Sequence, residues 1–151
     1  MVKRPHFVHY RALGISANPQ NFIPIDQVGE NGGVTAYLEP SLEVTEKEGD
    51  VYDDVLLTLA VCSPKDQYNR KRGRLASEGR MRKPRKHTIH RISNGDDGER
   101  LWQEIDRIVI AAWRRTCMLN EYDARDIPNL VRRSREHGTE TVLTAHGGYP
   151  A

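Results

Sequence analysis

Val55-Leu56-Leu57-Thr58-Leu59-Ala60-Val61-Cys62 is the longest apolar run in this chain of 151 residues. Asp53-Asp54 precede the run and Ser63-Pro64 follow it, so polar and turn-forming residues bound it on both sides. A short apolar run that contains β-branched residues is typical of a strand buried on both faces. We therefore expect residues 55–62 to form the central strand of a sheet.

The first third of the chain predicts further strands. Residues 7–15 and 22–28 are short runs with aromatic and β-branched side chains, and residues 34–38 follow Gly29-Glu30-Asn31-Gly32-Gly33. Glycine and asparagine accept the positive φ values of a hairpin loop, so we expect a small antiparallel meander. The acidic residues 40–50 are expected to form an exposed loop or an edge strand.

The residues after the apolar run carry a helix-start signature. Ser63 can act as N-cap, Pro64 suits the first helical position, and Asp66 completes a capping box. On this helix Tyr68, Leu75 and Gly79 would share the inner face, and Gly79 would end it. Gly73 costs such a helix about 1 kcal/mol relative to alanine, so the helix must gain stability by packing against the strand before it.

The second half of the chain predicts one long helix. Apolar side chains recur at steps of three and four between residues 96 and 119, which is the pattern of a core helix. Before it, Pro84 interrupts a basic segment that we expect to be an extended arm, and residues 87–92 alternate as a short strand does. After it, residues 126–136 predict a shorter helix that ends at Gly138, followed by a flexible tail.

These elements predict an α+β fold. We expect a small antiparallel sheet from the N-terminal half, packed on one long C-terminal amphipathic helix, with a basic helix and arm between them. Residues 1–138 would form a single domain that includes the basic helix and arm at 64–91, and residues 139–151 would form the flexible C-terminal tail.

Charge is concentrated in one segment. Residues 65–91 contain 11 Lys and Arg against 2 Asp and Glu, a net charge of +9, whereas the whole chain carries only +2. A cationic stretch without alternating acids favours a polyanion-binding surface over an ordinary solvated face. We expect phosphate contacts from Arg70, Lys71, Arg74, Arg82, Lys83, Arg85 and Lys86, and stacking on an unpaired base by Tyr68 or His87.

Part of this segment resembles a known pattern. Residues 62–80 read CSPKDQYNRKRGRLASEGR, in which an apolar strand leads into Asp, an aromatic residue, a basic pair and Gly-Arg. The block, about a fifth of the chain, is similar to a pattern in uncharacterised small proteins of bacteriophages. The resemblance implies a phage-type accessory protein and implies no activity.

Chemical motifs are sparse. The H-x-x-H pairs His6/His9 and His87/His90 lack a third ligand, so we expect surface histidines, no metal and no cofactor. A metal-dependent nuclease would have to use the groups Glu43, Glu46, Lys47, Asp53 and Asp54. Their spacing matches no nuclease signature, so we assign no catalytic residue and favour a protein that is not an enzyme.

Two further residue pairs bear on the cellular compartment of the protein and on the packing of its long helix. Cys62 and Cys117 show no metal-ligand spacing, and no run approaches the roughly 20 apolar residues of a membrane span, so we expect a reduced, cytoplasmic protein. Trp102 and Trp113 lie eleven residues apart and share a helix face, which favours core packing, with a dimer or protein-binding face as the alternative.

The sequence therefore predicts a small, non-enzymatic protein that grips the phosphate backbone of DNA or RNA. The first alternative is a phage-type inhibitor or adaptor that binds a host protein complex acting on nucleic acid. The second alternative is the metal-dependent nuclease. Oligomerisation is left open.

Overall fold

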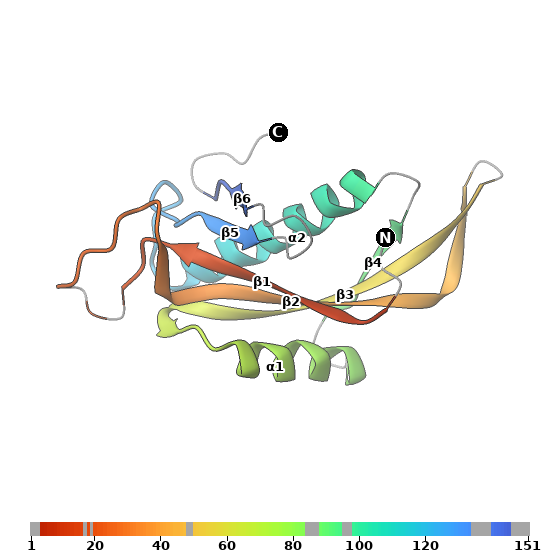
Figure 1. The fold of residues 1–151 in the computed structure, drawn as a ribbon, viewed down its shortest axis with the longest axis horizontal. Coiled ribbons are helices and arrows are strands. Elements are labelled where there is room, and N and C mark those ends of the chain that lie inside the picture. The colour runs from red at the N-terminus through yellow and green to blue at the C-terminus, as the bar shows by residue number, and fades with distance from the viewer. Residues whose placement is uncertain are drawn as a thin grey trace.

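The computed structural model of the chain describes residues 4–16, 18, 20–47, 50–83, 88–94, 98–133 and 140–145. Six strands and two helices follow one another along the chain in these residues (Figure 1). In chain order they are β1 (His6–Leu13), β2 (Val28–Lys47), β3 (Asp50–Gln67), α1 (Arg70–Arg82), β4 (His90–Asn94), α2 (Gly98–Leu119), β5 (Leu130–Arg133) and β6 (Glu140–Leu143).

The strands form one antiparallel sheet in the order β4-β3-β2-β1-β5-β6. β2 and β3 are the longest strands, and their hairpin extends well beyond the end of β1 (Figure 1). α1 covers one face of the sheet and α2 covers the other (Figure 1). Each helix therefore has its own contact surface on the sheet, and the two are separated by it.

The predicted fold, a small N-terminal sheet packed on one helix, is wrong. The sheet has six strands, three of which come from the second half of the chain, and a helix lies on each face. The reason is that β1 has backbone N–H and C=O groups along both of its edges that need hydrogen-bond partners. β2 pairs along one edge and β5 along the other, with Tyr10 opposite Arg132. Local sequence patterns carry no signal for that distant pairing.

Several predicted elements can be compared with the structure directly. The strand at residues 55–62 is confirmed within β3, where Val55 and Leu57 are fully buried, and the long helix is confirmed as α2. The short strand before α2 is present as β4. Trp113 is fully buried and its indole nitrogen donates to the Pro128 carbonyl at 2.8 Å, so this tryptophan has the core role.

Two N-terminal predictions are wrong. Residues 22–27 precede β2 as a loop, Val28 is the first residue of β2, and the glycine-rich residues 29–33 lie inside β2 rather than in a hairpin loop. The positive φ values of Gly32 and Gly33 occur where the β2–β3 register shifts. Gly32 packs against the Trp113 ring and Gly33 against the Tyr68 ring, so these glycines allow close approach at a bulge.

The C-terminal predictions need correction as well. Residues 130–133 form β5 and not a helix, because Leu130 and Val131 become buried when they pair with β1. Residues 140–143, predicted to belong to a flexible tail, form β6 and pair with β5. Residues 144–145 follow β6 as described coil, and the remainder of the predicted tail, residues 139 and 146–151, lies outside the described residues.

The core between the sheet and α2 includes one titratable thiol. Cys117 is fully buried, and burial raises the pKa of its thiol to about 12. An unfolded chain releases this proton near pH 8.5, so between about pH 8.5 and 12 the unfolded state alone is deprotonated. Stability is therefore expected to fall as the pH rises through this window.

This pH dependence is expected to reach about 1.4 kcal/mol between pH 7.5 and pH 9.5. Urea unfolding at the two pH values, on the wild type and on Cys117→Ala, measures it, because the variant should lack that part of the loss. Cys62→Ala is the comparison: burial raises the pKa of Cys62 as well, but Cys62 is partly exposed, so this variant should lose less of the pH dependence than Cys117→Ala. Equal pH dependence in the wild type and in Cys117→Ala would contradict the assignment.

Candidate nucleic-acid interface

α1 begins later than the sequence predicts. Ser63 and Pro64 lie in β3, which continues to Gln67, and the helix starts at Arg70 with Asn69 as its N-cap. The Asn69 side chain accepts a hydrogen bond from the Arg72 amide at 3.0 Å. The predicted capping box is wrong because the Ser63 hydroxyl accepts instead from the Lys65 amide at 3.2 Å, within the strand.

The later start rotates the predicted faces of α1. Ser77 and Met81 are the buried residues, and Gly73 lies against Thr35 of β2. The predicted inner face is wrong: Leu75 is 67% exposed, and Gly79 lies within the helix and faces open space. The Thr58 hydroxyl donates to the Ser77 carbonyl at 2.6 Å, which fixes the helix on the sheet.

The first turns of α1 form a dense cationic cluster. Its members are exposed and lie within five consecutive residues: Arg70, Lys71, Arg72 and Arg74. The first turn of this helix, all of which is described, contains no acidic residue. Cations at a helix N-terminus are unfavourable because the macrodipole is positive there, and the one acid of α1, Glu78, lies beyond the first two turns. The result is a concentrated positive potential next to free backbone N–H groups.

The structure separates the other predicted contact residues from this cluster. Arg82 lies at the opposite end of α1, about 20 Å along a helix of 13 residues. It forms an ion pair with Glu39 at 2.9 Å and donates to the Tyr37 hydroxyl at 3.2 Å. The bond to Glu39 raises the pKa of Arg82. Lys83 is exposed at the C-cap, whereas Arg85, Lys86 and His87 lie outside the described residues.

Sequence reasoning missed Arg72 as a member of the cluster. Its position in the uninterrupted run Arg70-Lys71-Arg72 is the signal that could have found it. Arg80, by contrast, has a structural contact, because its guanidinium donates to the Leu59 carbonyl of β3. The four cations of the first turns are therefore the group that the structure brings together.

Tyr68 directly precedes the N-cap of α1 and is buried, with 9% of its surface exposed. Its hydroxyl lies 2.6 Å from His9 Nδ1 and 2.8 Å from the Thr35 hydroxyl, and the Arg11 guanidinium lies 4.6 Å from the ring centroid. Burial raises the pKa of Tyr68. The ring is thus covered on the sheet side and is not available to stack on a base.

The groups required by a nuclease are not assembled in the described structure. Asp54 is fully buried and forms an ion pair with Arg91. The side chains of Glu43, Glu46, Lys47 and Asp53 lie outside the described part of the chain. Among the described residues, no three His, Cys, Asp or Glu side chains are grouped so that they could hold a metal ion.

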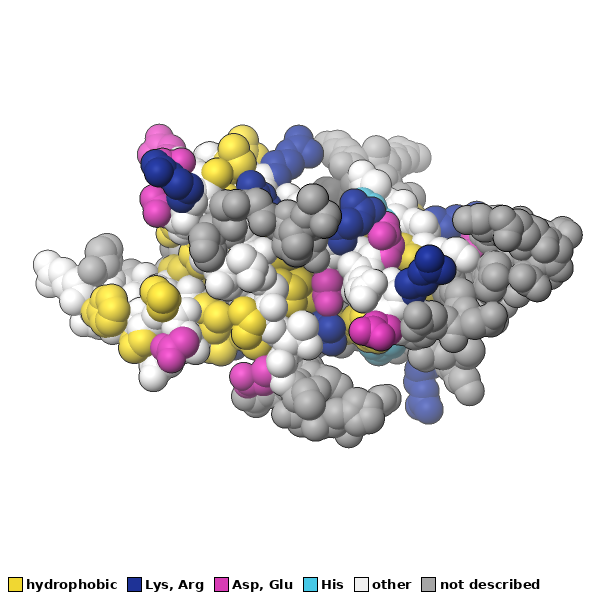
Figure 2. All heavy atoms as spheres, turned by 90° about the horizontal axis from the view of Figure 1, so that it is seen from above, with side chains coloured by type: hydrophobic (Ala, Val, Ile, Leu, Met, Phe, Trp, Pro, Cys, Tyr) yellow, Lys and Arg dark blue, Asp and Glu magenta, His cyan; other side chains and the backbone are white. Residues whose placement is uncertain are grey.

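The face away from α1 has a different charge pattern. Figure 2 shows that Lys and Arg side chains are interspersed with Asp and Glu on that face. On α2, for example, Arg107 forms an ion pair with Glu104 one turn away, and this hydrogen-bonded contact lowers the pKa of Glu104. The exposed cluster at the start of α1 lies on the other side of the sheet from this mixed surface.

Comparisons with known proteins give no match: no protein-family model, no curated protein and no solved structure matches this chain. The similarity of residues 62–80 to small phage proteins stays a prediction. No helix in the described part of the chain combines the length and the hydropathy needed to cross a membrane.

Proposed function

We propose that this protein binds nucleic acid through the first turns of α1, whose side chains contact the phosphate backbone. The observation that carries the proposal is the exposed cluster Arg70, Lys71, Arg72 and Arg74, which no acid in the first turn offsets. Guanidinium and ammonium groups neutralise phosphates and release condensed counterions, which gives affinity without base recognition. The free N–H groups at the helix N-terminus add to the attraction for an anion.

The same surface is a poor fit to an ordinary protein partner. The centre of a protein–protein interface is depleted of charged side chains and enriched in aromatic ones. Within residues 70–82, Leu75 is the exposed large apolar side chain, and the exposed residues around it are largely cationic. This composition favours a polyanion over an apolar protein surface.

The proposal predicts that removal of the cluster abolishes most of the affinity. The variant Arg70→Ala/Lys71→Ala/Arg74→Ala should bind labelled DNA and RNA at least about tenfold more weakly at moderate salt, as followed by fluorescence anisotropy. Alanine is the best helix former, and the lost cations stood at the positive end of the helix dipole. The variant should therefore be at least as stable as the wild type.

The matched control removes the same charge from the opposite face of the sheet. Arg100, Arg107 and Arg115 are exposed on α2, and their replacement by Ala should leave the affinity within about twofold. Equal losses in the two triple variants would reduce the effect to net charge and contradict an α1 interface. Absence of nucleic-acid binding by the wild type would reject the function and favour the protein-directed alternative, which nuclease-treated extracts would then test.

A further inference from the structure

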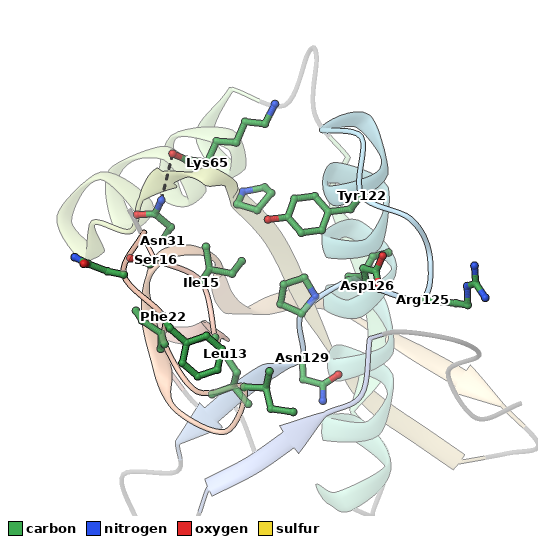
Figure 3. Close-up of a pocket in the computed structure, with 17 residues that line it drawn as sticks. Leu13, Ile15, Ser16, Phe22, Asn31, Lys65, Tyr122, Arg125, Asp126 and Asn129 are labelled. Atoms are coloured by element: carbon green, nitrogen blue, oxygen red, sulfur yellow. Dashed lines mark hydrogen bonds between the residues drawn. The ribbon is translucent and has the colours of Figure 1, made fainter. Parts of the chain in front are cut away.

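A pocket of about 790 Å³ lies at the end of the sheet next to the start of α1. The loop before β2 provides one wall and the loop after α2 the other. Figure 3 shows Ile15 and Phe22 on one side and Tyr122 on the other, with the Tyr122 hydroxyl pointing into the space between them. This volume is within the range of about 300–1,000 Å³ that ligand sites occupy.

The loop that forms the first wall exposes large apolar side chains. Phe22 is 85% exposed and Ile25 is 83% exposed. Apolar side chains also gather at this end of the molecule in Figure 2. Such exposure costs stability and marks a contact surface when it lies on an ordered loop. This loop is ordered at its base, because Gly14 donates to the Gln27 carbonyl at 2.8 Å.

A buried acceptor lies in the same wall. Asn31 is 3% exposed and lines the pocket, and its amide nitrogen donates to the Lys65 carbonyl at 3.3 Å. Its Oδ1 is buried and has no hydrogen-bond partner among the described residues. Buried side-chain acceptors without a donor are rare in folded proteins. The atom is covered in this structure, so it marks a polar position behind the pocket wall and not a contact open to a ligand.

The pocket lies close in sequence to the cationic cluster of α1, with Asp66 as the one acid between Lys65 and Arg70. Lys65 lines the pocket with its side chain exposed, and Asn69, four residues later, caps α1. The segment between them is fixed, since the Tyr68 amide donates to the Glu30 carbonyl at 2.9 Å. A phosphate backbone held on Arg70 and Lys71 can therefore continue over Lys65 to the mouth of the pocket.

We propose that this pocket receives an unpaired nucleobase, with Phe22 and Tyr122 as its aromatic walls, so that the preferred ligand is single-stranded nucleic acid. This inference rests on the proposed function. Single-strand binding proteins combine a cationic track for the backbone with aromatic side chains that stack on bases. The described face of α1 supplies the track and the pocket supplies the aromatic groups. A base paired inside a duplex cannot enter the pocket.

The test compares a labelled single strand of about 16 thymidines with a blunt duplex of the same length. Phe22→Ala is expected to weaken single-strand binding by about 5- to 150-fold, the range found for loss of one stacking contact, and to leave duplex binding unchanged. Val142→Ala is the control, because Val142 is also exposed, at 55%, but lies on β6. In addition, the emission of a Phe22→Trp variant should be quenched when the single strand is added.

Each outcome separates this inference from the proposed function. If Phe22→Ala weakens binding no more than Val142→Ala, while the α1 triple variant abolishes it, the pocket assignment is wrong and the α1 interface stands. Equal weakening of single-strand and duplex binding would also overturn the pocket assignment. If the wild type binds neither ligand, both proposals fail.

Discussion

Asp106→Ala is expected to destabilise the fold by about 3–5 kcal/mol, which is the cost of leaving one partner of a buried ion pair unpaired. Asp106 of α2 is 8% exposed. It accepts hydrogen bonds from both Nε and Nη2 of Arg132, each at 3.0 Å, and from the Tyr10 hydroxyl at 2.7 Å. The Arg132 guanidinium also lies 4.6 Å from the Trp102 ring centroid. Removal of the carboxylate leaves the guanidinium of Arg132, whose side chain is only 13% exposed, and the buried Tyr10 hydroxyl without their acceptor.

Glu104→Ala is the matched control for this change. Glu104 lies on the same helix and also pairs with an arginine, but 41% of its side chain and 59% of the Arg107 side chain are exposed. An exposed pair of this kind contributes about 0–1 kcal/mol. Urea unfolding of the two variants measures the difference. If Asp106→Ala costs no more than Glu104→Ala, the network does not hold α2 to β1 and β5 as we describe.

Gly73→Ala and Gly79→Ala are expected to change stability in opposite directions. A Cβ at position 73 would lie 2.1 Å from the Thr35 hydroxyl and 2.9 Å from the Thr35 Cβ, so α1 would have to move away from β2. Overpacking of this kind costs about 1–3 kcal/mol, which exceeds the gain of up to about 1 kcal/mol in helix propensity. At Gly79 nothing lies within 4 Å, so the propensity gain stands alone.

Thermal or urea unfolding of the two variants decides this point. We expect Gly73→Ala to be less stable than the wild type and Gly79→Ala to be more stable by about 0.5–1 kcal/mol. The same residue change on the same helix makes each variant the control of the other. Stabilisation by both changes would mean that α1 does not pack against Thr35 at this distance.

The elements that could be predicted from the sequence are those with a strong local pattern. Residues 55–62 and the apolar repeat of α2 are long and regular, and both are present. The start of α1 was misplaced because Ser-Pro-x-Asp suits a turn within a strand as well as a helix cap, and pairing of Gln67 with Asn31 favours the strand. β5 was mistaken for a helix because the edge of β1 that it covers is more than one hundred residues away in sequence.

The candidate site could likewise be predicted only where the local sequence carries a signal. A count of charges places the cationic segment, but the helix phase decides which cations are free, and that phase depends on Asn69 as the cap. The pairing of Arg82 with Glu39 joins residues 43 positions apart and leaves no trace in local composition. The pocket likewise combines Phe22 with Tyr122, which belong to loops at opposite ends of the sequence.

The salt dependence of nucleic-acid binding tests the central proposal most directly. Each phosphate contact contributes about −0.9 to the slope of log K against log salt concentration on B-DNA, so the four cations of α1 predict a slope between about −3 and −4. Affinity should then fall by about 100-fold between 50 and 200 mM salt. In the α1 triple variant the slope should flatten to about −1, and in the α2 triple variant it should be unchanged. A slope near zero in the wild type, or an equally steep slope in the α1 variant, would contradict the account.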